Sequence, residues 1–448
     1  MESQSTFHHA LKVVDELCIG CTHCMTVCPT QAIRVRDGKA LISEERCVDC
    51  GNCCKACPVS AILIEQDDFQ EIFNYKVRIA LVPSVFIGQF PSHILTGDIF
   101  GGMKRLGFTH IFEIDSVVGL VQQGYDGITG DPAIEKPAIS TFCPSIVRLI
   151  QVRFPSLVDH LIGVKPPSDV AAIFYRKQME EAGYDPDEIG IFYITPCAAK
   201  IASIKSPVGE EVSSVNGVIN MEYIYNKLLQ LIMNNEVREA AGPDSEKLDS
   251  KGILWSLTRG ESEHQIGRCL AVDGIRNVTE FLERLEETEE SHIDFLELRA
   301  CDESCAGGVL ISENRFLTVE RLNRRATGAS NETAGQFTPA SFDQTLFALD
   351  KIQARSMLAL DPDRSVAMKK MHMLEELLKV LPGIDCAACG SPTCRALAED
   401  IVQEKALPTW CLFLQELYIS DGRLSLEEAD EINGSIWGKD RSYRSQSK

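Results

Sequence analysis

Two cysteine runs of one form lie within the first 60 residues and constrain this chain more than any other feature of its sequence. They read CIGCTHCMTVCP at residues 18–29 and CVDCGNCCKACP at residues 47–58, and both match C-x2-C-x2-C-x3-C-P. Loops this short let three thiolates surround one corner of an iron-sulfur cubane. Zinc sites rarely use cysteine at this density. The repeated run therefore predicts two 4Fe-4S clusters.

The assignment of these cysteines to two clusters follows from the ligand pattern of bacterial two-cluster ferredoxins. The fourth cysteine of each run ligates the cluster of the other run. We expect one cluster on Cys18, Cys21, Cys24 and Cys57, and the other on Cys47, Cys50, Cys53 and Cys28. Cys54 falls outside the pattern, and we interpret it as a packed thiol. Residues 1–70 should form a small α+β domain of the bacterial ferredoxin type.

Composition supports metal ligation over disulfides. The chain has 18 cysteines, its first residues lack the basic and apolar segments of a signal peptide, and no apolar run reaches the roughly 20 residues of a membrane span. We therefore expect a cytoplasmic protein, and that compartment keeps thiols reduced. A net charge of −21 disfavours nucleic acid as a partner.

The middle of the chain changes character at about residue 75. Apolar runs such as KVRIALVPSV, EIGIFYITPC and HIDFLELRAC alternate with stretches whose apolar residues recur at helical spacing. This alternation predicts an α/β domain with parallel strands over residues 75–360.

A third group of cysteines lies near the C-terminus. Cys386, Cys389 and Cys394 share a loop with glycine and proline, and Cys411 follows a predicted helix, giving C-x2-C-x4-C-x16-C. The segment resembles small 4Fe-4S domains of membrane-linked electron-transport subunits and corrinoid proteins. We expect a third cluster in a small helical domain over residues 361–437, with structural zinc as the alternative. Residues 438–448 should be a disordered tail.

Four further cysteines follow apolar segments of the central domain: Cys143, Cys197, Cys301 and Cys305. Any one of them alone would be interpreted as a buried core cysteine. Three come directly after predicted strands, where open parallel sheets place their functional groups. The remaining cysteine, Cys269, we interpret as core packing.

Over residues 1–345 the chain resembles the [FeFe]-hydrogenase family. The resemblance rests on STFCPSIVRLIQVRFPSLVDHL, on ITPCAAK, and on the segment from AVDGIRNVTEFLERL to DFLELRACDESCAGG. It implies two α/β lobes that enclose an H-cluster, which is a 4Fe-4S cubane joined through a cysteine to a di-iron unit carrying CO and cyanide.

The resemblance also assigns roles. Cys143, Cys197, Cys301 and Cys305 would hold the cubane, with Cys305 bridging to the di-iron unit. Lys200 would donate a hydrogen bond to a cyanide, and Pro83 and Ser84 would line the same pocket. Such ligands need donors in a cavity that excludes water.

The family's proton relay is interrupted in this sequence. Its cysteine is replaced by Phe142, which has no exchangeable proton, and its serine by Ile162. Its two acidic positions fall at Gln123 and Asp126, so only Asp126 could titrate. Candidate catalytic positions are therefore Lys200, Ser84, Asp126 and the altered position Phe142.

The pocket differs from the family as well. Two methionines become Thr195 and Arg299, a glutamine becomes Ser168, and C-P-G-G-C reads CDESC at 301–305. The loss of both glycines removes backbone that could approach the di-iron ligands closely. These changes argue against the di-iron unit but leave the cubane cysteines in place.

Three functions fit these features. The first is electron transfer or redox sensing by a divergent family member of non-classical or sensory type, with hydrogen turnover slow or absent. The second is a working hydrogenase that uses another proton route, through Asp126 or water. The third is a cluster carrier within an oxidoreductase complex. Each implies a redox partner, either a ferredoxin or an oxidoreductase subunit. No nucleotide-binding fingerprint is present, so NAD or flavin chemistry would belong to another subunit.

Overall fold

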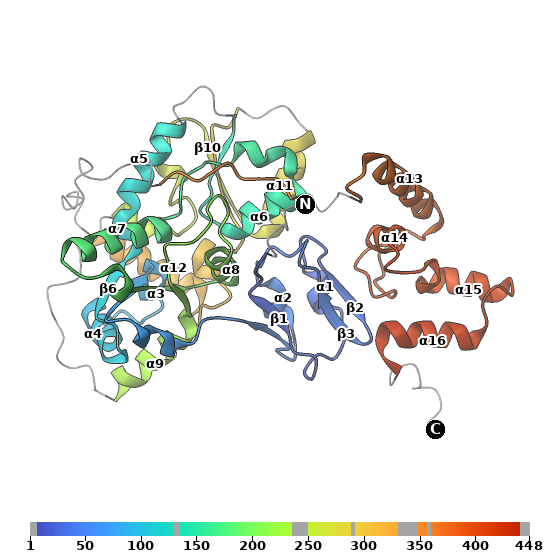
Figure 1. Cartoon of the computed structure of the whole chain (residues 1–448), viewed down its shortest axis with the longest axis horizontal. Coiled ribbons are helices and arrows are strands. Elements are labelled where there is room, and N and C mark those ends of the chain that lie inside the picture. Colours follow the sequence, from blue (N-terminus) through green and yellow to red (C-terminus); the bar gives the residue numbers. More distant parts are fainter. Residues whose placement is uncertain are drawn as a thin grey trace. The chain divides into compact units, whose positions relative to one another are not determined.

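The computed structural model describes residues 7–129, 135–234, 250–287, 292–329, 347–355 and 360–439. The chain divides into two compact units (Figure 1). The larger contains residues 1–10 and 65–354, and the smaller contains residues 11–64 and 355–448. The expected disordered tail lies outside the described residues from position 440 onward.

The first sheet of the larger unit has four parallel strands in the order β6-β5-β8-β9. Its strands are β5 (Val77–Val82), β6 (His110–Glu113), β8 (Ile189–Thr195) and β9 (Gly217–Asn220). All seven residues of β8 are buried, as expected for a parallel strand covered on both faces.

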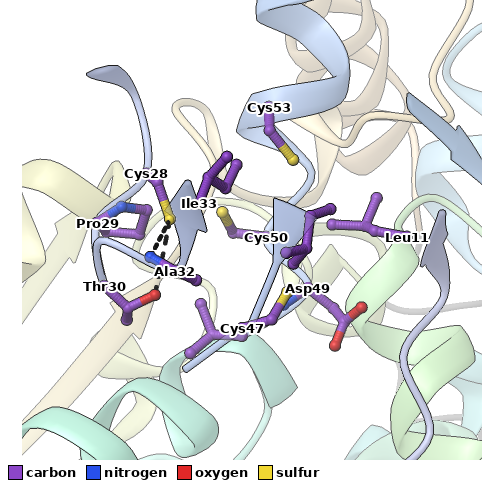
Figure 2. Close-up of a pocket in the computed structure, with 12 residues that line it drawn as sticks. Leu11, Cys28, Pro29, Thr30, Ala32, Ile33, Cys47, Asp49, Cys50 and Cys53 are labelled. Atoms are coloured by element: carbon purple, nitrogen blue, oxygen red, sulfur yellow. Dashed lines mark hydrogen bonds between the residues drawn. The ribbon is translucent and has the colours of Figure 1, made fainter. Parts of the chain in front are cut away.

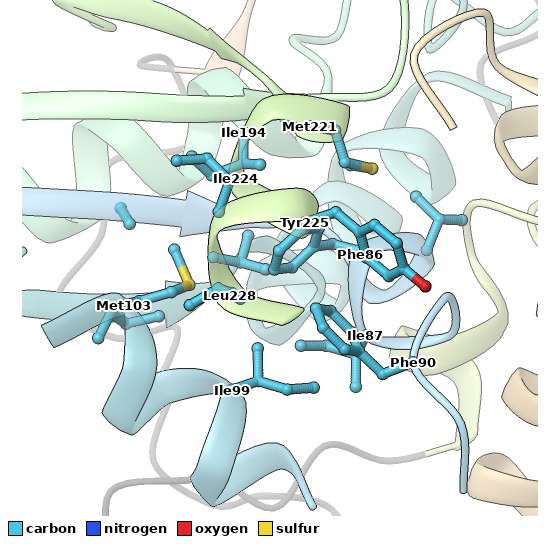
Figure 3. Packing of buried hydrophobic residues seen from close by; sticks show 14 of the residues in the cluster. Phe86, Ile87, Phe90, Ile99, Met103, Ile194, Met221, Ile224, Tyr225 and Leu228 are labelled. Carbon is cyan, nitrogen blue, oxygen red and sulfur yellow. The ribbon is translucent and has the colours of Figure 1, made fainter. Parts of the chain in front are cut away.

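An apolar core packs against this sheet. It is formed with helices α3 (Ser84–Ile87), α4 (Thr96–Leu106) and α9 (Met221–Met233). Figure 3 shows Phe90 and Tyr225 in contact, and their ring centroids are 4.8 Å apart. Full burial of a large apolar side chain contributes about 1.5–3 kcal/mol, so this cluster stabilises the packing of these helices on the first sheet.

The second sheet has three parallel strands in the order β10-β11-β7. They are β10 (Cys269–Asp273), β11 (Phe295–Arg299) and β7 (Ala138–Ile139). Cys269 begins a strand and is partly exposed, so its interpretation as core packing was wrong. The described part of the chain thus holds two parallel sheets in this unit, which confirms the predicted α/β architecture.

The other helices of the larger unit follow or join these strands. They are α5 (Val118–Thr129), α6 (Pro144–Arg153), α7 (Pro167–Glu181), α8 (Ala198–Lys205), α10 (Ser250–Leu254), α11 (Ile275–Glu287) and α12 (Arg315–Thr327). Helices α6 and α8 each begin directly after a cysteine, Cys143 and Cys197 respectively.

The N-terminal part of the smaller unit has two short antiparallel sheets. Strands β1 (Leu11–Val13) and β4 (Ile62–Ile64) form one, and β2 (Ile33–Arg36) and β3 (Lys39–Ile42) form the other. Helices α1 (His23–Thr26) and α2 (Asn52–Ala56) lie within the two cysteine runs. This arrangement confirms the predicted ferredoxin-like α+β fold.

The C-terminal part of the same unit is helical, as predicted. Its helices are α13 (Arg364–Val380), α14 (Cys394–Val402), α15 (Leu412–Ser420) and α16 (Leu426–Trp437). Cys389 and Cys411 lie in its apolar core beside Leu374 and Leu397. Among the described residues, no helix combines the length and apolar character needed to cross a bilayer.

Candidate iron-sulfur sites and the central pocket

The first predicted set of N-terminal cysteines comes together around the buried thiol of Cys24. Burial raises the pKa of Cys24 to about 11, and the neighbouring charges of Cys21, Cys18 and Cys57 contribute to the rise. The two runs therefore meet in the way that the exchange of their fourth cysteines requires. Backbone N–H groups point at two of these sulfurs, from Ala40 to Cys18 Sγ at 3.4 Å and from Ala61 to Cys57 Sγ at 3.2 Å.

The second set lines a pocket in the same part of the unit. Figure 2 shows Cys28, Cys47, Cys50 and Cys53 around it. Burial raises the pKa of Cys50 to about 12, and Cys28 adds to the effect. The N–H of Ala32 donates to Cys28 Sγ at 3.2 Å.

These thiols fit a metal cluster for an electrostatic reason. Buried, closely spaced thiols resist ionisation because each thiolate loses its hydration and repels the next. Bound iron supplies the positive charge that lets all four ionise. Cys54 differs, because its thiol donates to the carbonyl of Ile62 at 3.2 Å.

The C-terminal cysteines also converge. Burial raises the pKa of Cys389, and both Cys411 and Cys386 contribute to the rise. Cys394 is the first residue of α14, and Cys411 immediately precedes α15. Helix N-termini stabilise thiolates, so both positions suit cluster ligands.

The central cysteines follow strands of both sheets of the larger unit, since Cys197 comes after β8 of the first sheet and Cys143 and Cys301 come after β7 and β11 of the second. Burial raises the pKa of Cys197 to about 12; the charges of Cys305 and Cys143 act in the same direction, and Lys200 opposes them. Cys301 lies in the same loop as Cys305, and its carbonyl accepts a hydrogen bond from Ser304 N–H at 3.1 Å.

The loop from 301 to 305 adopts a strained backbone. Glu303 and Ser304, which replace the family's two glycines, have φ of 59° and 51°. These are left-handed conformations that glycine adopts without penalty and other residues rarely adopt. The loop thus keeps a shape that glycine would favour, although its residues are not glycine.

Phe142 fills the space beside Cys143 and is 2% exposed. Two cations lie over its ring, with Lys200 Nζ 4.5 Å and Arg299 Cζ 3.8 Å from the centroid. Both are buried. The position that would relay protons is therefore occupied by an apolar ring held by two cations.

Arg299 is held by acidic residues that the sequence did not reveal. Its Nη2 lies 2.7 Å from Glu261 Oε2, and its Nε lies 3.6 Å from Glu297 Oε1. These two carboxylates raise the pKa of Arg299, so it stays charged although burial opposes this. Its Nη1 has no hydrogen-bond acceptor among the described residues.

The network continues through two hydroxyl groups. Tyr125 and Ser140 donate to Glu261 Oε1 at 2.8 and 2.9 Å, and Ser140 Oγ accepts from Phe142 N–H at 3.1 Å. Burial raises the pKa of Glu261. The only sequence signal for this network was an acidic residue, Glu297, inside the apolar run DFLELRA.

The remaining pocket residues predicted from sequence have structural partners of their own. Thr195 is buried, and its hydroxyl donates to Cys197 O at 3.1 Å, which orders the turn into α8. Ser84 follows Pro83 at the start of α3, and its N–H donates to Asp115 Oδ2 at 2.6 Å. Burial raises the pKa of Asp115 to about 7.

The expected relay positions are separated in the structure. Asp126 and Gln123 are exposed on α5, where Gln122 donates to Asp126 Oδ1 at 2.7 Å. Ile162 is buried, and Ser168 is buried beside Asp169. Burial raises the pKa of Asp169 to about 6, and Lys200 lowers it. The motifs did not identify Asp115, which is buried, or Asp169, which is partly buried and whose pKa is lowered by Lys200 against the effect of burial.

Comparison with protein families matches three parts of the chain. Residues 76–252 match the family described as iron only hydrogenase large subunit, C-terminal domain. Residues 10–58 match a 4Fe-4S dicluster domain, and residues 381–413 match the family described as "Putative Fe-S cluster". Iron-sulfur cofactors are therefore part of this protein.

Two of the curated relatives are hydrogenase subunits. The "NADP-reducing hydrogenase subunit HndD" of Solidesulfovibrio fructosivorans is 24% identical over 53% of this chain and 39% of its own length. The "Periplasmic [Fe] hydrogenase large subunit" of Nitratidesulfovibrio vulgaris is 29% identical over 43% of this chain and 50% of its own. The chain thus spans half or less of these relatives.

A shorter match links the chain to another redox complex. One subunit of the ion-translocating oxidoreductase complex of Rhodobacter capsulatus is 42% identical over 50 residues, 10% of this chain and 27% of that protein. Among solved structures, a single-residue variant of the [FeFe]-hydrogenase HydA1 from Chlamydomonas reinhardtii covers 64% of this chain and 98% of its own at 13% identity, with a TM-score of 0.49.

Proposed function

This chain belongs to the [FeFe]-hydrogenase family, and we propose that it transfers electrons through iron-sulfur clusters while hydrogen turnover is slow or absent. Its role is redox sensing or electron relay in the cytoplasm. The proposal is supported by the donor sets of the smaller unit and by the altered pocket of the larger one.

Four 4Fe-4S clusters make up the proposed cofactor set. Two are held by the N-terminal cysteines, one by Cys143, Cys197, Cys301 and Cys305, and one by the four C-terminal cysteines. When bound, such clusters take up and release single electrons. The protein supplies thiolates, backbone N–H donors to the sulfurs, and burial that excludes water.

The observation that carries the proposal is the surroundings of Phe142. Hydrogen turnover needs protons to cross the apolar shell of the pocket, with a titratable group within hydrogen-bond reach. Phe142 cannot provide one, and Arg299 over its ring is locked in the charged form by two carboxylates. Lys200 is present at the position that would donate a hydrogen bond to a cyanide ligand. The pocket therefore keeps this hydrogen-bond donor but lacks the cysteine of the proton relay.

The redox partner is proposed to be a ferredoxin or an oxidoreductase subunit. Relatives are named as subunits of an NADP-reducing hydrogenase and of an ion-translocating oxidoreductase complex. These names also keep open the third function, a cluster carrier within a larger complex.

A working hydrogenase is the second candidate, and one observation favours it. Asp115 is buried, has a pKa of about 7 and accepts a hydrogen bond from Ser84 N–H. A carboxyl group with that pKa can exchange protons near neutral pH. Asp126, by contrast, is exposed on α5.

The test is to produce the full chain together with the maturation proteins of the family, then record infrared spectra and hydrogen turnover. We expect turnover that is slow or absent. CO and cyanide bands with fast turnover would establish the working hydrogenase instead. The absence of these bands after full maturation would leave electron relay or a cluster-carrier role.

A further inference from the structure

The C-terminal cysteine site and the N-terminal cysteine runs fold into the same compact unit, and a charged contact joins them. Arg34 in β2 binds Asp400 in α14 through two hydrogen bonds, Nε to Oδ2 at 2.6 Å and Nη2 to Oδ1 at 3.1 Å. Arg36 reaches the same carboxylate at 3.0 Å, and Arg46 binds the adjacent Glu399 at 2.8 Å. We call this set the arginine clamp.

The clamp is largely shielded from water. The side chains of Arg34 and Asp400 are 13% and 12% exposed, and those of Arg46 and Glu399 are 13% and 10% exposed. Paired guanidinium and carboxylate groups with this burial fix geometry more strictly than surface pairs do. The clamp therefore holds α14, which begins at Cys394, in one position on β2.

Backbone contacts bring the cysteine loop itself against β2. The N–H of Val35 donates to the carbonyl of Gly390, the residue after Cys389, at 2.8 Å. Gly390 has a φ of +70°, and an added Cβ would lie 2.3 Å from Val35 O. A glycine is needed at this point both for its backbone conformation and for the close approach.

A short hydrogen-bonded route then connects ligand residues of two cluster sites. Ala32 N–H donates to Cys28 Sγ at 3.2 Å, and the preceding residue, Gln31, accepts from Thr393 Oγ1 at 3.2 Å. Thr393 is bonded to Cys394. The route from Cys28 to the segment that carries Cys394 thus runs through a hydrogen bond to sulfur, the peptide link between Ala32 and Gln31, the Gln31 side chain and its hydrogen bond with Thr393.

We propose that the C-terminal cluster exchanges electrons directly with the N-terminal cluster held by Cys28, Cys47, Cys50 and Cys53, across the contact between β2 and α14. The exchange moves one electron: one cluster is oxidised from the 1+ to the 2+ state, and the other is reduced from 2+ to 1+. No bond forms or breaks and no proton is transferred. The smaller unit is then a three-cluster module, and this inference rests on the cofactor set proposed above.

The test is electron paramagnetic resonance of the full chain with its clusters, reduced with dithionite. Two reduced clusters that are neighbours broaden and split each other's signals and relax faster than isolated ones. Cys386→Ser removes a ligand that is exposed in the structure, so it should disturb the fold little. We expect a loss of about four iron atoms per chain and loss of the additional splitting and fast relaxation that the C-terminal cluster causes, while the interaction between the two N-terminal clusters remains. Cys269→Ser, a matched change outside the cluster sites, should alter neither.

A second variant keeps every cysteine. Asp400→Asn weakens the clamp, so full iron content with weaker splitting is the expected result even if Cys386→Ser fails to fold. Wild-type protein with full iron whose N-terminal signals have the same splitting and relaxation as those of Cys386→Ser would overturn the inference. Iron too low for the C-terminal cluster in the wild-type chain would overturn the cofactor set first, and the inference with it.

Discussion

The side chain of Phe142 occupies the position where our proposal places the break in the proton relay. It is 2% exposed, lies under two cations and adjoins the ligand position Cys143. Phe142→Cys would restore a proton-exchanging group at this point. A positioned acid or base contributes roughly 10²–10⁴-fold, so we expect hydrogen turnover of the matured variant to rise by up to about 10²-fold.

Phe142→Val provides the matched control for this experiment. Valine removes the ring and leaves comparable space but offers no proton, so its turnover should stay near that of the unaltered protein. Equal turnover in the cysteine and valine variants would show that space, and not the missing proton carrier, limits the pocket.

Asp115 should give the larger unit a pH-dependent stability. Burial raises its pKa from an ordinary carboxyl value to about 7. A raised folded pKa stabilises the protein fully below the unfolded pKa near 4, and this stabilisation is lost as pH rises through 7. The loss amounts to about 4 kcal/mol, because each pKa unit corresponds to about 1.4 kcal/mol.

Asp115→Asn should therefore flatten the pH profile. The amide stays neutral at every pH, and its oxygen can still accept a hydrogen bond from Ser84 N–H. The melting temperature of the variant should therefore exceed that of the wild type at pH 8 and match it near pH 4. Thermal melts between pH 4 and 8 measure this difference. Asp421→Asn, at an exposed pair with Arg423, serves as control. Parallel profiles for wild type and Asp115→Asn would contradict the prediction.

At the scale of elements, the loop between Cys301 and Cys305 holds two residues in left-handed conformations. Glu303 has a φ of 59°, at a cost of about 1 kcal/mol that glycine does not bear. Glu303→Gly should stabilise the larger unit by up to about 0.5 kcal/mol, which is the strain relieved less the cost of the added freedom of the unfolded chain. Chemical denaturation checks this, with Glu222→Gly at an exposed position of helix α9 as the destabilising control.

The arginine clamp should be worth more than an exposed ion pair. Removing one charge from a buried pair typically costs 3–5 kcal/mol, so Asp400→Asn should cost about 3 kcal/mol, the low end, because the pair keeps some exposure. Trp410 and Trp437 lie in the C-terminal part and report its unfolding in urea by fluorescence. Asp421→Asn should cost less than about 0.5 kcal/mol. Similar losses of unfolding free energy in Asp400→Asn and Asp421→Asn would contradict the prediction that the arginine clamp stabilises the smaller unit.

At the scale of the whole molecule, sequence spacing predicted the cluster ligands that lie close together along the chain. It did not predict contacts between residues that are far apart in the sequence. The two runs and their exchange of Cys28 and Cys57 followed from spacing, because cluster ligands must lie on short loops. The strands were found because parallel strands buried on both faces are continuously apolar. No such periodicity marks Glu261, which meets Arg299 only after folding.

The contact between the chain's two ends was equally hidden from the sequence. Arg34 and Asp400 are separated by 366 positions, and neither lies in a motif that requires the other. Charged residues usually face solvent, so such a pair is recognised only when the fold brings it together. The same is true of Asp115, whose pKa depends mainly on burial.

Iron content tests the cofactor set as a whole. Four cubanes require about 16 iron atoms per chain, and a di-iron unit raises the total to about 18. We expect about 16 in protein made without the maturation proteins, measured by inductively coupled plasma mass spectrometry on protein of known concentration. A value near 12 would mean that one of the four cysteine sets does not hold a cubane.

The rate of hydrogen turnover per chain in fully matured protein, measured with a reduced dye as electron donor, tests the central claim most directly. Typical enzymes turn over at about 1–10³ per second. With Phe142 and Arg299 in the pocket we predict a rate below about 1 per second. A rate above about 10² per second would contradict the account and identify the chain as a working hydrogenase.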